Sequence, residues 1–240
     1  SGGAILELDF IPFTANLTDV MTRQKEPYHP TVKDKEIIYD PYRRLSWLDH
    51  FFSEATTLEN FRRGTYAEMG DFIAGAYQPV LSRRWGNLDL SLSREGAVVI
   101  GAEKLPVKVK KTAYFTKKDA KLHIEYEIVN LSGQELTVQF ASEFAFGFPA
   151  ADEAREENGV LSLKLIDRRE RFALDFRLSE SAKAWRFPLD TVSRSDQGFE
   201  KVYQGMALVF AWPIALRAGH FWRSEMIIEC TAILPNAGRK

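Results

Sequence analysis

Pairs of carboxylates two residues apart occur at Glu7 and Asp9, and again at Glu125 and Glu127. If each pair lies in a β-strand, its two side chains point to one face, because alternate residues of a strand share a face. Glycoside hydrolysis requires two converging carboxyl groups, about 5–5.5 Å apart in retaining enzymes and farther apart in inverting ones. Acids are common on the solvent face of a strand, so we interpret Glu125 and Glu127 as solvated. Glu7 and Asp9 remain candidates for a site.

The four histidines, His29, His50, His123 and His220, lack the spacing of a metal site, since neither H-x-H nor H-x-x-x-H occurs. We expect His123 on the polar face of a strand and His220 in a hairpin turn. His29, or His50 with its neighbour Asp49, could supply an acid–base pair, and a structural role is the alternative. Phosphate-loop, dinucleotide and nucleophile-elbow motifs are absent. We therefore expect no cofactor and no metal.

Tryptophans are the second class of candidate, because flat rings pack on the apolar faces of sugars. Trp212 and Trp222 lie in apolar runs and are expected in the core. Trp85 stands beside Gly86, near a predicted turn, and is expected to be exposed. Trp47 and Trp185 lie in irregular segments. An exposed pair of Trp47 and Trp85 would indicate a carbohydrate-binding module.

The elements that must position these residues are strands. In residues 121–129, Leu122, Ile124, Tyr126 and Ile128 alternate with polar residues, which predicts a strand with one buried and one wet face. The same alternation occurs at 105–115, 135–146, 159–166, 171–178 and 206–212, with turn residues between the segments. The pattern predicts an antiparallel all-β fold. Short helices are expected only at 42–52 and 57–63.

Residues 185–205, WRFPLDTVSRSDQGFEKVYQG, do not fit this pattern. Their length and their turn-forming residues predict a structured loop, in which Gly198 can take a positive φ. Residues 14–75 are also loop-rich. Such segments usually carry function or pack against another domain. No linker or repeat divides the chain, so we expect residues 1–240 to form a single domain.

Composition excludes several classes of partner. The net charge of the 240 residues is −1, which argues against a nucleic acid or an anionic membrane as partner. The basic cluster Lys108, Lys110 and Lys111 is interpreted as a solvated strand face. The single cysteine, Cys230, cannot form an intrachain disulfide and is expected to be a buried core thiol. No secretion signal or membrane-length apolar run occurs, and we expect a cytoplasmic location.

Four separated blocks resemble the C-terminal domain of glycoside hydrolase family 57 enzymes, the α-amylase/4-α-glucanotransferase type. Residues 39–52 (YDPYRRLSWLDHFF) and 56–72 (TTLENFRRGTYAEMGDF) form two of them, and residues 185–205 form a third. The remaining block, residues 2–29, is similar to the family's opening pattern at Gly2, Gly3, Glu7, Leu8, Asp9, Asn16, Leu17, Asp19, Arg23, Tyr28 and His29.

The resemblance implies a large galactose mutarotase-like β-sandwich, a supersandwich, that follows a (β/α)7 catalytic barrel. The family's catalytic Glu nucleophile and Asp acid belong to that barrel, which these residues do not contain. The resemblance therefore implies a non-catalytic accessory domain that supports the barrel and contacts α-1,4-glucan. The parent enzyme is an amylase, a branching enzyme or a transferase. The candidates for contact with glucan or barrel are Glu7, Asp9, His29, Arg43, Arg44, Trp47, Asp49, His50, Trp85, Trp185, Arg186 and Glu200.

Two alternatives remain open at this point. A stand-alone carbohydrate-binding module would bind maltooligosaccharides through exposed aromatic side chains. A mutarotase-like or hydrolytic enzyme would need a histidine and a carboxylate that converge in a pocket, drawn from His29 or His50 and from Glu7 or Asp49. General acid–base catalysis requires that geometry first.

Overall fold

The computed structural model describes residues 2–11, 15–27, 29, 37–84, 87–116, 121–148, 153–167, 172–195 and 198–233. Trp85 and Tyr28 lie outside the described residues, so the expected exposure of Trp85 is not tested. No helix among the described residues is long and apolar enough to span a membrane.

In the part of the chain that the structure describes, ten strands form one antiparallel sheet. Their spatial order is β3-β8-β11-β10-β12-β7-β6-β5-β4, and β9 pairs with β10 outside this path. Two short strands, β1 (Asp9–Phe10) and β2 (Ala15–Asn16), pair separately. The ten strands are β3 Leu48–Phe52, β4 Gln78–Arg84, β5 Asn87–Ile100, β6 Glu103–Phe115, β7 Lys121–Asn130, β8 Leu136–Phe146, β9 Arg155–Asp167, β10 Phe172–Ser195, β11 Gly198–Leu216 and β12 Phe221–Ala232.

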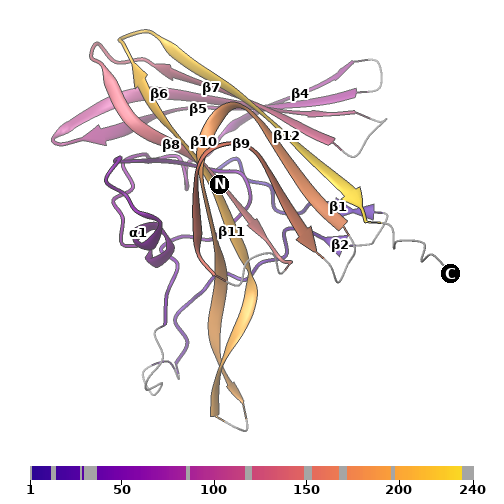
Figure 1. Ribbon diagram of the computed structural model, residues 1–240. Coiled ribbons are helices and arrows are strands. Elements are labelled where there is room, and N and C mark those ends of the chain that lie inside the picture. The colour runs from indigo at the N-terminus through magenta and orange to yellow at the C-terminus, as the bar shows by residue number, and fades with distance from the viewer. Residues whose placement is uncertain are drawn as a thin grey trace.

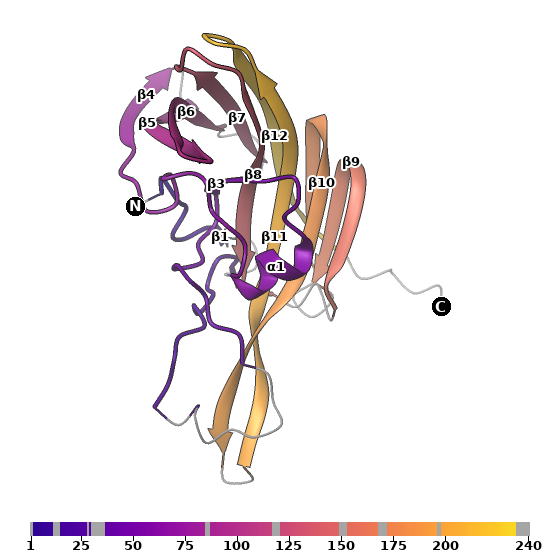
Figure 2. The same ribbon diagram turned by 90° about the vertical axis from the view of Figure 1, so that its left-hand side faces the viewer.

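The sheet folds over itself into two facing layers (Figures 1 and 2). One layer holds β3, β8, β11, β10 and β9, and the other holds β12, β7, β6, β5 and β4. Aromatic rings meet between the layers: Phe140 of β8 lies 5.3 Å from Tyr126 of β7 and 5.7 Å from Trp222 of β12, measured between ring centroids. The predicted antiparallel β-sandwich is confirmed.

Alternation places most strands as predicted, and β7 buries every second residue from Leu122 to Asn130. The interpretation of Lys111 as solvated is wrong. It follows Val107 and Val109 on the inward face of β6 and is fully buried, whereas Lys110 is exposed. Burial is also continuous along residues 206–212 of β11, because a second apolar cluster beside α1 covers the outer face of this layer.

Helix α1 (Leu58–Arg63) confirms the helix predicted at 57–63. Thr57 accepts a hydrogen bond from the Asn60 N–H and caps its start, and Gly64 (φ 68°) ends it. The helix predicted at 42–52 is wrong, because its second half is strand β3. All five residues of β3 are buried between the core and the α1 side, so no amphipathic helical pattern operates there.

Residues 185–205 form a hairpin rather than the predicted loop. Pairing between β10 and β11 runs from Lys183↔Ala211 to Ser195↔Gly198, with a register shift after Leu189. Gly205 sits at this shift with φ 152°, and a Cβ there would lie 2.5 Å from the Phe146 carbonyl oxygen. Beyond the shift, residues 190–195 and 198–203 pair with each other and project from the sandwich as a ribbon (Figures 1 and 2). We call this segment the ribbon.

Candidate functional site

Strand β3 places two candidate catalytic residues on opposite faces of the first layer. Asp49 points into the space between the layers, where Lys111 of β6 lies 2.8 Å away. His50 points to the other face, where its ring lies 5.2 Å from the ring of Phe61 in α1. Adjacent residues of a strand must diverge in this way. His50 and Asp49 therefore do not form the acid–base pair that the sequence left open.

The His50 ring lies between two carboxylates. Its Nε2 is 2.9 Å from Glu143 of β8, and its Nδ1 is 2.9 Å from Glu68. Burial lowers the pKa of His50, but the two hydrogen bonds and charges outweigh it and raise the pKa to about 9. The imidazole is therefore protonated at neutral pH and donates from both nitrogens. An imidazolium that is fully buried and doubly bonded has no nitrogen left to act as a general base.

Glu143 is the centre of this cluster. It accepts hydrogen bonds from the Tyr42 hydroxyl at 2.7 Å, from Arg44 and from His50. Burial raises the pKa of the Glu143 carboxyl, but Arg44 and His50 lower it to about 2. Buried charges persist only when they are paired and hydrogen-bonded in this way.

Arg44 extends the cluster toward the loop that precedes β3. Its Nε donates to Asp40 at 2.6 Å, and Asp40 also receives Nη2 of Arg23 at 2.6 Å. Despite burial, both arginines lower the pKa of Asp40. Arg44, Arg23 and protonated His50 thus balance Glu143, Asp40 and Glu68 in charge. We call these residues, with Tyr42 and Tyr66, the Glu143 network.

A second buried ion pair joins the two layers. Lys111 Nζ donates to the carbonyl oxygens of Gly2 (3.0 Å) and Trp47 (2.5 Å), and it lies 2.8 Å from Asp49. The Tyr77 hydroxyl donates to the same carboxylate at 2.5 Å. Burial lowers the pKa of Lys111, and Asp49 opposes this shift. The pair therefore fixes residues 2–3 and β3 against β6.

Trp47 links the two clusters through its backbone. Its N–H donates to the Glu143 carbonyl at 2.7 Å, and its carbonyl accepts from Lys111. Its φ of 71° is unusual for a bulky residue, and the surrounding contacts hold it there. The indole is buried, so Trp47 is not one of the exposed aromatic side chains that the carbohydrate-binding-module alternative requires. Trp185 is also buried, stacked 5.6 Å from Phe52 with its Nε1 donating to Glu156.

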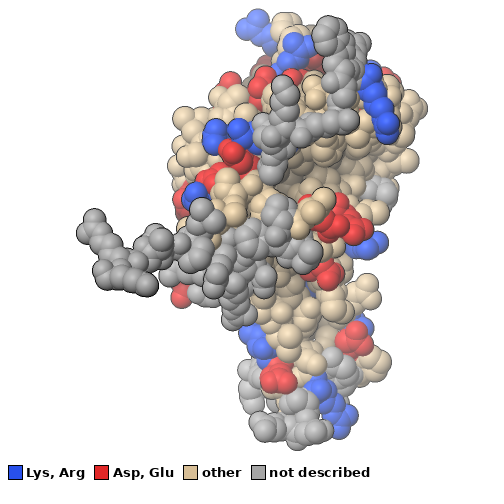
Figure 3. Space-filling view, turned by 90° about the vertical axis from the view of Figure 1, so that its right-hand side faces the viewer, with Lys and Arg blue, Asp and Glu red and all other residues tan. Residues whose placement is uncertain are grey.

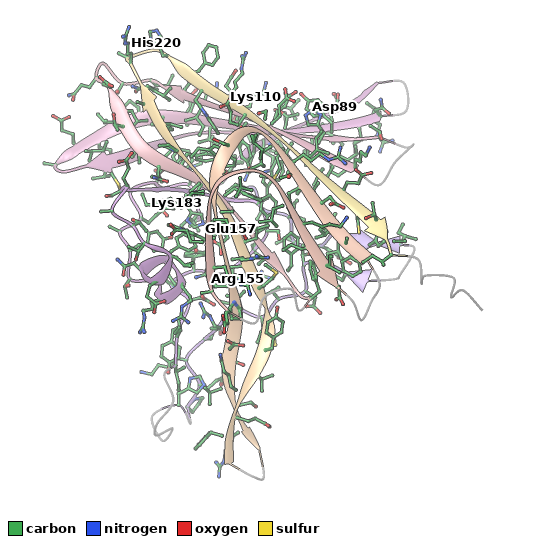
Figure 4. The ribbon with its side chains drawn as sticks, viewed as in Figure 1. Asp89, Lys110, Arg155, Glu157, Lys183 and His220 are labelled. Atoms are coloured by element: carbon green, nitrogen blue, oxygen red, sulfur yellow. The ribbon has the colours of Figure 1, made fainter. Side chains whose placement is uncertain are left out.

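The remaining predicted residues divide between surface and packing roles. Glu7, Asp9, Arg43 and Glu200 are exposed. Among the described residues, no ion pair includes Glu7 or Asp9. Arg186 donates to Glu157, which is labelled in Figure 4, at 2.8 Å.

His29 is buried against the ribbon, with Nε2 3.3 Å from the Val192 carbonyl oxygen. His123 lies on the polar face of β7, and His220 at the β11–β12 turn, as predicted. Cys230 is only partly buried, and burial together with Asp175 raises the pKa of its thiol to about 12.

An apolar groove of about 390 Å³ opens beside β1. Figure 3 views the molecule from this side, where uncharged residues fill much of the middle of the described surface. The groove residues are Leu8, Asp9, Phe10, Ile11, Leu17, Phe115, Thr116, Lys121, Leu122, Leu174, Ile228 and Cys230. Asp9 thus lies at an apolar margin, and the described residues that line this groove include no second carboxylate, so they do not provide the pair of a glycoside hydrolase site.

Sequence reasoning missed Glu143, Glu68, Asp40 and Tyr42. Residues 39–44 and 68 lie in irregular segments, and only the fold brings them to β8. Glu143 carried one signal, since it interrupts the apolar run FASEFAF, and an acid inside such a run needs a buried partner.

The family model described as "Alpha-amylase/4-alpha-glucanotransferase, C-terminal" matches residues 1–36 and 33–226. An α-amylase from Pyrococcus abyssi is 29% identical over 239 residues, which cover 89% of this chain and 34% of that protein. A 4-α-glucanotransferase from Thermococcus kodakarensis is 27% identical over 238 residues, again covering 89% and 34%. The chain thus spans about a third of the length of these curated relatives.

Solved structures agree with the fold. The crystal structure of 4-α-glucanotransferase from Thermococcus litoralis matches with a TM-score of 0.83 and 26% identity, over 95% of this chain and 34% of that one. A galactose mutarotase-like protein from Clostridium acetobutylicum matches with a TM-score of 0.53 and 9% identity, over 97% of this chain and 90% of that one. The second likeness shows the fold alone.

Proposed function

The chain belongs to the family of α-amylase/4-α-glucanotransferase C-terminal domains, and on that premise we propose that it is a non-catalytic accessory domain of a larger α-glucan-active enzyme. Residues 1–240 form a single sandwich domain in this proposal. The observation that carries it is the length of the match, which covers most of this chain but about a third of each relative. Hydrolysis or transfer of α-1,4-glucan would be carried out by the rest of the polypeptide.

The charged clusters support a structural role. Asp49 and His50 were candidates for acid–base chemistry, but Asp49 forms a buried ion pair with Lys111 and His50 forms one with Glu143. Groups arranged in this way hold loops against the sandwich, because each buried charge keeps its partner in place. In the proposal, the Glu143 network fixes residues 39–44 and 66–68 as a rigid surface for the catalytic domain.

The ribbon is the surface that we assign to the catalytic domain. A two-stranded hairpin alone is at most marginally stable in water, and the ribbon extends beyond the sandwich with part of the N-terminal segment beside it (Figure 2). Val192 and His29 join the two segments. Arg194, Glu200 and Lys201 are exposed on the ribbon. We place these exposed side chains at the margin of the glucan cleft, where they would contact sugar hydroxyls.

The test uses the full polypeptide that contains this chain. Exchanging two charges on the ribbon, Arg194→Glu with Glu200→Arg, keeps the net charge and leaves the sandwich core unchanged. We expect altered turnover of maltoheptaose or an altered distribution of product lengths. His220→Ala, at the end of the molecule opposite the ribbon (Figure 4), is the matched control and should have no effect. Unchanged turnover and products in a folded ribbon variant would refute the assignment.

A further inference from the structure

Three potential metal ligands converge on the outer face of the second layer, away from the Glu143 network. His123 and Glu125 belong to β7 and share its polar face, and Glu225 belongs to the neighbouring strand β12. His123 Nε2 lies 3.2 Å from a Glu225 carboxylate oxygen. One ligand atom from each of the three residues lies within 4.8 Å of the other two. The arrangement combines one imidazole with two carboxylates.

The register of the sheet makes this spot electrostatically unusual. Glu125 lies directly opposite Glu225 across the β7–β12 pair, and like charges in that position destabilise a sheet. The next pair along the strands is compensated, since Arg223 lies opposite Glu127 and its Nε donates to that carboxylate at 2.8 Å. Among the described residues, Glu225 has an ion pair only with His123, and Glu125 has none. A cation between the two carboxylates would remove their repulsion.

Tyr114 of β6 supports the ligands from the adjacent strand. Its hydroxyl donates to Glu125 at 2.7 Å, and its ring lies 5.4 Å from the His123 ring. Residues that do not bind the metal themselves typically orient its ligands through hydrogen bonds. Tyr114 thus contacts both ligands that β7 contributes.

We propose that His123, Glu125 and Glu225 bind one divalent transition-metal cation of the zinc type. A neutral imidazole and two carboxylates suit such an ion and neutralise its two charges. Calcium takes about 6–8 oxygen ligands, which these three residues do not supply. Zinc bonds of about 2.0–2.2 Å require the donors to move closer than in the present arrangement, and partly exposed side chains allow this through rotamer changes.

Water can complete the coordination. A surface groove of about 280 Å³ includes Glu125 and Glu225 among its lining residues. Its rim carries Lys110, labelled in Figure 4, which lies opposite Glu127 in the β6–β7 register. The ion would cross-link β7 to β12, two neighbouring strands of the second layer, and would stabilise the sandwich without taking part in glucan chemistry.

The experiment titrates the metal-free chain with ZnCl₂ by isothermal calorimetry and follows its Tm. We expect one ion per chain and, at a zinc concentration about 100 times the Kd, a rise in Tm of roughly 5 °C. His123→Gln and Glu225→Gln should each weaken binding at least tenfold. Glu127→Gln, on the same face of β7 but paired with Arg223, should bind zinc as the unsubstituted chain does.

Two results would overturn the proposal. One is absence of zinc binding by the unsubstituted chain. The other is binding that persists unchanged in both His123→Gln and Glu225→Gln, which would place the ion elsewhere, for example at His220. Since the assay needs no glucan and no catalytic domain, its failure is distinct from failure of the accessory-domain proposal.

Discussion

Replacing Glu143 by glutamine should destabilise the sandwich more than any surface substitution. The carboxylate accepts from Tyr42, Arg44 and His50, whereas the amide presents only one oxygen and adds an N–H₂ group that faces the same donors. Arg44 and His50 would remain as buried cations with fewer partners.

The magnitude follows from burial. Removing one partner of a buried ion pair costs about 3–5 kcal/mol. Asp40 and Glu68 remain to partner Arg44 and His50, so we expect the lower end, a loss of about 3 kcal/mol in the free energy of unfolding. That loss is a large share of the roughly 5–15 kcal/mol by which domains are stable.

Urea denaturation at pH 7, followed by tryptophan fluorescence, measures the change, because Trp47 and Trp185 are buried and become exposed on unfolding. Glu59→Gln is the control. Glu59 pairs with Arg62 and Arg63 on the outer face of α1, and such exposed pairs contribute about 0–1 kcal/mol. A Glu143→Gln variant as stable as the Glu59→Gln variant would refute the role of the network.

Three further predictions concern stability. The pKa of His50 is raised from 6.5 to about 9, so its contribution is complete below pH 6.5 and is lost as pH rises through 9; unfolding free energy should fall by about 3 kcal/mol over that window, by urea titration at several pH values. Asp49→Asn should cost about 3–5 kcal/mol by leaving the Lys111 ammonium buried without its counter-charge, and adding Lys111→Met should recover most of the loss, which a double-mutant cycle would detect. Gly64→Ala should reduce the free energy of unfolding by about 1 kcal/mol or more and so lower Tm, because φ at this position is 68° and the new Cβ would lie 2.7 Å from Pro41 Cδ. An unchanged Tm would contradict the strain at this cap.

Much of the sandwich could be predicted because its strands carry the pattern that positions them. The alternation in residues 121–129 specifies which face is buried, and the structure buries the same side chains. For Lys111, the alternation of the strand predicted burial, but the expectation that a lysine is solvated was followed instead. Its place in the alternation with Val107 and Val109 pointed inward, whereas its neighbours Lys108 and Lys110 suggested solvent.

The buried charge network could not be predicted in the same way. His50 and Glu143 are 93 positions apart, and their pairing depends on β3 lying beside β8. The prediction of a loop at residues 185–205 was wrong for a different reason. One proline, two serines and two glycines in residues 185–205 are typical of loops, but residues 183–195 of β10 pair with residues 198–211 of β11, and the pairing accommodates Gly205 at the register shift.

The most direct test of the accessory role is to incubate the purified chain with maltoheptaose and to analyse the products by chromatography, with the heat of binding measured on the same preparation. A non-catalytic accessory domain should form neither free glucose nor oligosaccharides of new length, whether or not heat of binding is detected. Formation of either product by this chain alone would contradict this role.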